Sequence, residues 1–143
     1  MKGIILALLG FLLLAAPAVV QAQAGCGDGY TYSLNGSNAN SITITGYWRL
    51  GGAVTIPTNI NGFAVTSIGS NAFALITIGR GYPVSTPTNL LTSVTIPGSV
   101  TNVGYGAFAE CYELTNAALA YGVTSIGANA FYRCERLTGT SFH

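Results

Sequence analysis

The residues that could carry out chemistry are few. The 143-residue sequence contains three cysteines, four carboxylates and one histidine, His143. A Ser-His-Asp site needs a histidine held beside its nucleophile, and a zinc site needs about four nitrogen or sulfur ligands brought together. Cys26 is far along the chain from the other two cysteines, and no phosphate-binding glycine motif opens a helix. We therefore expect no catalytic residues, no metal ligands and no cofactor, in a protein that is not an enzyme.

The charged residues form one cluster. Glu110 and Arg133 are 23 residues apart, and Glu113, Glu135 and Arg136 lie close to them in the sequence. Two carboxylates acting as acid and base would need a pocket and shifted pKa values, whereas these residues fall around turns that we expect to be exposed. Exposed ion pairs are common and contribute little to stability. We interpret the cluster as solvated ion pairs between neighbouring repeats.

Two of the cysteines share the same spacing. Cys111 and Cys134 are 23 residues apart, so in a stack of 23-residue coils their Cα atoms would lie about 5 Å apart, within the range that a disulfide requires. Buried cysteine also packs as a small apolar residue, and exported proteins meet oxidants. The sequence leaves two states open, a stacked pair of thiols and a disulfide between coils.

The shared spacing reflects an internal repeat of 23 residues, which predicts a stack of similar coils. A further copy ends at Phe73, 35 residues before the copy that ends at Phe108. The extra residues fall in the segment 78–89, which is rich in Gly, Pro and Thr and is typical of a loop insertion. The repeated positions are Leu91, Leu114 and Leu137; Val94, Ala117 and Thr140; Ile96, Leu119 and Phe142; and Phe108 and Phe131.

Each repeat has the pattern of a short β coil. Residues 91–97 alternate apolar and polar side chains, as in a half-buried strand, and Pro97 ends the strand because proline cannot donate to a ladder. Residues 100–104 form a second extended piece, and residues 105–111 have room for about one turn of α or 3₁₀ helix. Coils stacked at about 4.8 Å would bring equivalent apolar residues together into a continuous core.

The segment from Val94 to Leu114, with its motif VTIPGSVTNVGYGAFAECYEL, resembles the BspA-like leucine-rich repeat. Residues 41–69 are similar to the opening segment of such proteins, and the resemblance covers about residues 41–142. It departs from the family pattern at Ala117 to Leu119, where the third unit lacks VTIP. The resemblance implies a leucine-rich-repeat solenoid, mainly β, with short parallel strands, short 3₁₀ or helical segments and a buried cysteine in each coil. It also implies a secreted or surface protein, in a family often linked to adhesion.

The first 24 residues have the three parts of a secretory signal peptide: a positive start, an apolar core and an A-x-A end. We expect cleavage after Ala24, which leaves no membrane span. A retained anchor and a lipoprotein modified at Cys26 are the alternatives. The expected domain map is a signal peptide (1–24) and one repeat domain (25–143), the latter divided into N-terminal strands or cap (25–57), repeat coils (58–136) and an incomplete last repeat (137–143).

The composition argues against nucleic acid as a partner, and the aromatic residues indicate where another partner could bind. Charged residues make up 6% of the sequence and the net charge is +1, so no basic surface suited to nucleic acid is expected. Trp, Tyr and Arg are enriched at binding hot spots. We expect Trp48 and Arg49 to lie at the tip of a hairpin, and Arg80 and Tyr82 to lie on the insertion, where repeat proteins often bind. The alternatives are that Trp48 covers the end of the core and that the insertion is a tolerated surface loop.

We therefore expect a non-enzymatic secreted or cell-surface protein that binds an extracellular protein or glycan. The alternative is a structural protein that associates with itself. Residues 137–142 form a strand with no polar capping repeat after it in this sequence, so its edge could pair with another chain.

Overall fold

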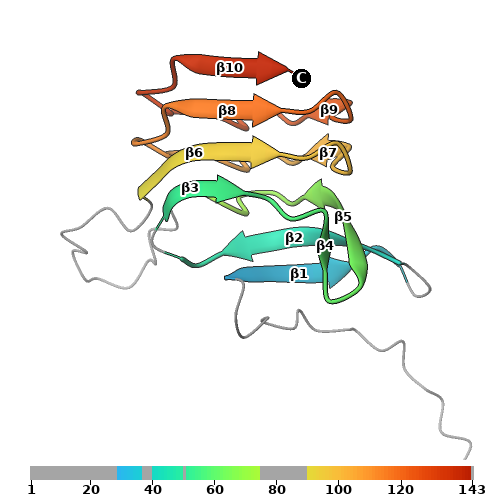
Figure 1. Ribbon diagram of the computed structural model, residues 1–143. Helices are drawn as coiled ribbons and strands as arrows, with labels where there is room; N and C mark the ends of the chain where they lie inside the picture. Colours follow the sequence, from blue (N-terminus) through green and yellow to red (C-terminus); the bar gives the residue numbers. More distant parts are fainter. Residues whose placement is uncertain (1–28, 37–39, 50, 75–89, 143) are drawn as a thin grey trace, which may run out of the picture.

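The computed structural model describes residues 29–36, 40–49, 51–74 and 90–142, which form ten short strands (Figure 1). The expected leader, Cys26 and the expected insertion with Arg80 and Tyr82 lie outside these residues. The described residues include no helix, and so none that could cross a membrane. The strands are β1 (Tyr30–Leu34), β2 (Ser41–Tyr47), β3 (Gly51–Thr55), β4 (Asn59–Ile60), β5 (Phe63–Ile68), β6 (Leu90–Ile96), β7 (Asn102–Val103), β8 (Asn116–Leu119), β9 (Ser125–Ile126) and β10 (Gly139–Phe142).

The coils stack along one direction and contribute strands to two sheets (Figure 1). One sheet has the order β10-β8-β6-β3 and is parallel throughout, while the other has the order β1-β2-β5-β7-β9, with β4 paired to β5. Val94 pairs with Ala117, and Ala117 pairs with Thr140. In the second sheet, Val103 pairs with Ile68 on one side and with Ile126 on the other. The predicted parallel solenoid and its register are therefore confirmed, including the strand that departs from the family pattern.

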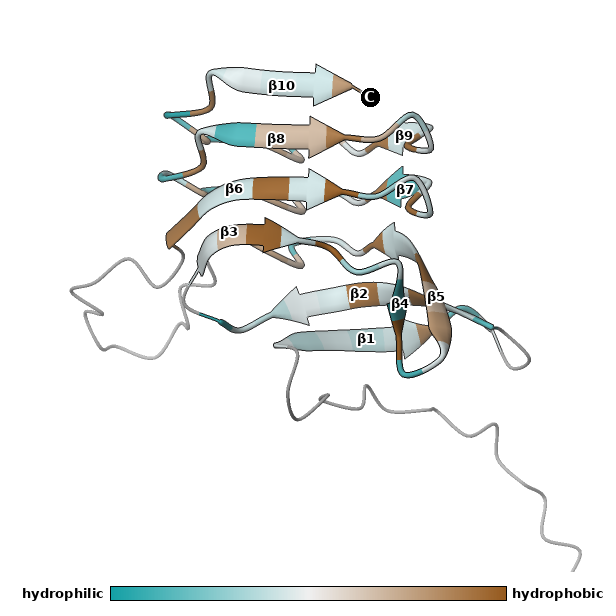
Figure 2. Cartoon of the chain, viewed as in Figure 1, coloured by the Kyte–Doolittle hydropathy of each residue, from teal (hydrophilic) through white to brown (hydrophobic). Residues whose placement is uncertain are grey.

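Stacking aligns apolar side chains in columns that exclude water. Leu91, Leu114 and Phe108 are all 0% exposed, and Figure 2 shows hydrophobic segments of β6 and β8 in neighbouring coils. Fully burying one such side chain is worth about 1.5–3 kcal/mol. A single coil has no interior of its own, so this free energy is gained only when coils stack.

The segment that follows each short strand of the second sheet consists of turns, and the helical turn that we predicted there does not form. Successive backbone amides in this segment donate to different parts of the molecule. The Ala109 N–H donates to the Gly106 carbonyl within the segment at 2.8 Å, but the Phe108 N–H donates to the Ala130 carbonyl of the next coil, also at 2.8 Å. A helix would use all these amides within the segment. Glu110 also has a positive φ of 59°, which ends a right-handed turn.

The N-terminal end of the core is covered by β1, which pairs antiparallel with β2. The ring centroid of Tyr47 lies 5.1 Å from that of Tyr30 and 5.1 Å from that of Phe73, so two tyrosines continue the column of phenylalanines. Trp48 is 59% exposed and does not cover the core. The covering role that we considered for Trp48 therefore belongs to Tyr30 and Tyr47.

The expected hairpin around Trp48 is wrong. Strand β2 pairs with β1 and β5, whereas β3 pairs with β6 in the other sheet. Gly51 and Gly52 have φ values of 97° and 89°, a conformation that residues with a Cβ rarely adopt. These two glycines begin β3 and let the chain leave one sheet and enter the other.

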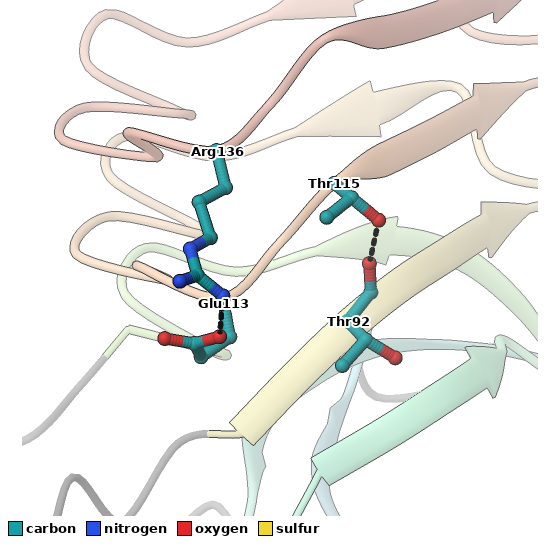
Figure 3. Close-up of polar contacts among 4 residues, drawn as sticks. All are labelled: Thr92, Glu113, Thr115 and Arg136. Atoms are coloured by element: carbon teal, nitrogen blue, oxygen red, sulfur yellow. Dashed lines mark hydrogen bonds and ion pairs between the residues drawn. The ribbon is translucent and has the colours of Figure 1, made fainter.

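Threonines link consecutive coils at two corners. The Oγ1 of Thr115 donates to the carbonyl of Thr92 at 2.9 Å, and the N–H of Thr115 donates to the same carbonyl at 2.8 Å (Figure 3). At the other corner, the Thr124 hydroxyl donates to the Thr101 carbonyl at 3.0 Å, and the Thr101 hydroxyl donates to the Thr66 carbonyl at 3.2 Å. Each bond joins equivalent positions and so favours one register between coils.

The last described coil exposes side chains whose equivalents are buried in the preceding coil. Ile126 is 45% exposed, but Val103 at the same position is 0% exposed. Phe142 is 59% exposed, while its equivalent Leu119 is 1% exposed. Strand β10 is the outermost strand of its sheet in Figure 1, and this coil leaves Ile126 and Phe142 exposed.

Candidate functional site

Trp48 and Arg49 lie in the connection that leaves β2. The backbone N–H of Trp48 donates to the carbonyl of Gly29 at 3.0 Å, which anchors the connection to the start of β1. The Arg49 side chain lies against Gly29: a Cβ on this glycine would come within 2.5 Å of the arginine Cγ. Because Gly29 also has a φ of 78°, a larger residue there would be strained and would displace Arg49. The exposed indole therefore projects from an anchored backbone.

Tyr47 completes this end of β2 and separates the exposed pair from the core. Its ring stacks on Phe73 with an interplanar angle of 28°. Burial raises the pKa of the Tyr47 hydroxyl above its usual value, while the nearby Arg49 guanidinium acts in the opposite direction. Of the four candidate binding residues, the structure thus describes two, Trp48 and Arg49, as chain neighbours. Arg80 and Tyr82 lie outside the described residues.

The N-terminal part of the described chain is nearly free of charge. Arg49 is the one charged side chain among the described residues of 29–74. The outer face of β1 and β2 instead carries hydroxyl and amide groups. Asn35 accepts a bond from the Thr43 hydroxyl at 2.6 Å and donates to the Thr66 hydroxyl at 3.0 Å, and Thr45 donates to Thr31 at 3.1 Å. The sequence pattern around Ile42 and Ile44, where Ser and Thr alternate with isoleucine, is the signal that indicates this network.

The charged cluster consists of ion pairs between two coils, as predicted. Arg133 lies 3.6 Å from Glu110, and Arg136 donates to Glu113 at 2.5 Å (Figure 3). The side chains are 34% to 64% exposed, so water screens these charges. Each of the two glutamates faces an arginine of the next coil. This arrangement suits a link between coils and not a pair of carboxylates sharing a substrate.

Cys111 and Cys134 are both in the thiol form. Cys111 donates to the Phe73 carbonyl at 3.3 Å, and Cys134 donates to the Phe108 carbonyl at 3.1 Å, so both thiols take part in the same contact with the preceding coil. Within the described ranges, no three or more His, Cys, Asp or Glu residues gather as metal ligands would. The described residues around the end of β2 present an indole face, a guanidinium and neutral hydrogen-bonding groups.

Comparison with known proteins agrees with this geometry. Residues 86–143 match the family model described as "BspA type Leucine rich repeat region (6 copies)". No curated protein matches the chain. A leucine rich cell surface protein from Faecalibacterium prausnitzii A2-165 is similar in structure, with a TM-score of 0.61 and 29% identity over 78% of this chain and 28% of that chain. The T. pallidum leucine rich repeat protein has a TM-score of 0.57 and 27% identity over 78% of this chain and 46% of that chain.

A leucine-rich repeat protein from Bacteroides capillosus ATCC 29799 shares the fold, with a TM-score of 0.50 and 20% identity over 80% of this chain and 94% of that chain. The stacked parallel coils therefore define a leucine-rich-repeat solenoid. The part of the chain that matches the BspA-type leucine-rich repeat model, residues 86–143, includes the motif between Val94 and Leu114 that resembles this family. The chain spans only 28% and 46% of the lengths of the first two similar proteins.

Proposed function

We propose that this protein is a non-enzymatic binding protein, secreted or held at the cell surface, and that Trp48 and Arg49 form its contact with an extracellular protein or glycan. The observation that carries the proposal is the 59% exposure of Trp48 on an anchored connection. Trp48 is not used to cover the core, and Trp and Arg are enriched at binding hot spots.

The position of the pair supports the same function. In repeat proteins the coil core is common to all members, so specificity comes from exposed residues outside the repeated columns. Trp48 and Arg49 are outside the columns, and changing them leaves the stacked Leu, Ile and Phe side chains untouched. Arg80 and Tyr82 stay predicted members of the same contact surface.

The test uses the single tryptophan of the chain, Trp48. Its fluorescence is titrated with a panel of purified extracellular-matrix proteins and of neutral and acidic oligosaccharides. We expect at least one panel member to shift the emission of Trp48 to shorter wavelength and to shield it from acrylamide, because binding removes water from the indole. A panel member that binds without changing Trp48 emission or quenching would contradict the assigned contact.

Export is the second part of the proposal, with cleavage after Ala24. Mass analysis of the N-terminus of the chain, recovered from both the culture medium and the membrane fraction, tests it. We expect a chain that begins at Gly25. A chain that begins at a lipid-modified Cys26 would replace the soluble protein by an anchored one, and an uncleaved leader would mean that the leader is retained as an anchor.

Self-association is a second candidate function, and the exposed apolar side chains of the last described coil favour it. Ile126 in β9 and Phe142 in β10, the outermost described strands of the two sheets, are 45% and 59% exposed. Sedimentation of the parent chain and of the Ile126→Lys, Phe142→Lys double variant tests this function. Association that weakens in the double variant supports it, whereas a parent chain that stays monomeric at high concentration removes it.

A further inference from the structure

Cys111 and Cys134 occupy the same position of consecutive coils, each three residues after a stacked phenylalanine. Both thiols donate to a phenylalanine carbonyl of the preceding coil, at 3.3 Å from Cys111 and 3.1 Å from Cys134. The N–H of Glu110 donates to the Tyr132 carbonyl at 2.7 Å, which holds the two coils together next to the cysteines. The two side chains therefore follow each other along the stack on a fixed backbone.

The two thiols differ in their access to solvent. Cys111 is 0% exposed, whereas Cys134 is partly exposed. Hydrogen bonding with Cys111 lowers the pKa of the Cys134 thiol, against the rise that its burial causes. A thiolate is the attacking form in disulfide exchange, and a reagent must reach it from solvent. Cys134 can be reached from solvent, whereas Cys111 is buried.

We infer that Cys134 and Cys111 form a thiol–disulfide exchange site that reacts with small disulfides from solvent and closes into a disulfide between coils. The two cysteines lie beside turns of consecutive coils that are joined by the Glu110–Tyr132 backbone bond. Coils stacked at the usual strand spacing of about 4.8 Å would place the two Cα atoms within the 4.4–6.8 Å that a disulfide allows. Formation of this disulfide replaces two weak thiol–carbonyl hydrogen bonds and leaves the Glu110–Tyr132 backbone bond in place. The site is independent of the proposed binding function.

The reaction has two exchange steps. The Cys134 thiolate attacks one sulfur of a small disulfide RS–SR, an S–S bond forms between Cys134 and that sulfur, and RS⁻ leaves and takes up the proton that Cys134 released. Cys111 then gives up its proton and attacks the Cys134 sulfur, which expels the second RS⁻, and this thiolate takes that proton. Two protein thiols are oxidised to one disulfide, and RS–SR is reduced to two RSH.

The experiment uses the full chain with Cys26→Ser, so that only the two cysteines react. It is incubated with oxidised glutathione, quenched with acid at intervals, alkylated and analysed by peptide mass spectrometry. We expect a transient glutathione adduct on Cys134, followed by a disulfide that links the Cys111 and Cys134 peptides within one chain. The Cys111→Ser variant should stop at the stable Cys134 adduct. In the Cys134→Ser variant, Cys111 should react at least about tenfold more slowly.

The order of alkylation in the parent chain provides a measurement that needs no folded variant. Before oxidation, iodoacetamide should label Cys134 before Cys111. A glutathione adduct that persists on Cys134 while Cys111 stays a thiol would overturn the inference. So would equal labelling rates, absence of any oxidation, or a disulfide formed only between two chains.

Discussion

The ring of Phe131 lies parallel to the ring of Phe108, with their centroids 5.2 Å apart and an interplanar angle of 7°. Phe108 in turn stacks on Phe73 at 4.8 Å, and Tyr47 and Tyr30 extend this column to the N-terminal end. The five rings run through the described coils and join the core to its cap. Exposed residues near one end, such as Trp48, therefore project from a continuous packed structure.

Replacing Phe108 by Ala should open a cavity between two rings and lower the free energy of unfolding by about 3–5 kcal/mol. Phe108 is 0% exposed, so water cannot compensate for the lost contacts. Urea unfolding followed by circular dichroism measures the change. A loss of less than about 1 kcal/mol would mean that the coils do not depend on this column.

Replacing Trp48 by Ala should change the free energy of unfolding by no more than about 0.5 kcal/mol, because the side chain is mostly exposed. The same urea experiment measures this change. Tyr121→Ala is the matched control, since Tyr121 is 82% exposed on a more distant coil. If Trp48→Ala were as destabilising as Phe108→Ala, Trp48 would be a cap and the proposed contact would lie elsewhere.

Stability should fall at alkaline pH partly through Tyr47. Its folded-state pKa is raised above the usual value of 10.0, mainly by burial, so the unfolded chain loses this proton more readily than the folded protein. The contribution of Tyr47 is complete below pH 10 and is lost as the pH rises through the raised pKa. Urea midpoints measured from pH 8 to pH 11 should decline less steeply for Tyr47→Phe than for the parent chain. Identical slopes would contradict the assignment.

The ion pair between Arg136 and Glu113 should contribute only weakly. Their side chains are 64% and 36% exposed, so a double-mutant cycle with Arg136→Gln and Glu113→Gln should give a coupling free energy of about 0.2–1 kcal/mol. In 1 M salt, where the Debye length is about 3 Å, the coupling should decrease. A coupling above about 2 kcal/mol, or one that salt leaves unchanged, would show a stronger link between coils than the exposure allows.

The parallel coils could be predicted because apolar residues that form the core recur at the period of the coils. Leu91, Leu114 and Leu137 recur at one spacing, and a shift of register would bring polar residues into the same column. The ion pair of Glu110 with Arg133 followed from the same spacing. Both are consequences of a single repeat length.

Features outside the repeat could not be predicted in this way. The antiparallel strand β1 has no equivalent in the coils, and the change of sheet at Gly51 and Gly52 depends on two unusual backbone conformations. The sequence around Phe108 predicts a helical turn. The hydrogen bond that prevents a helix there is made by the Phe108 N–H to the Ala130 carbonyl of the next coil. Local sequence does not contain this partner. It does not determine the exposure of Trp48 either, because that depends on how β1 covers the core.

The central claim, that Trp48 is a contact residue and not part of the core, is tested most directly by the dissociation constant of the Trp48→Ala variant. It is measured by surface plasmon resonance against the panel member that shifts Trp48 emission, with Tyr121→Ala as control. We predict that Trp48→Ala raises the dissociation constant at least about 30-fold, the effect of a hot-spot residue worth about 2 kcal/mol or more, and that Tyr121→Ala changes it less than about twofold. Equal affinity of the parent chain and Trp48→Ala would contradict the account.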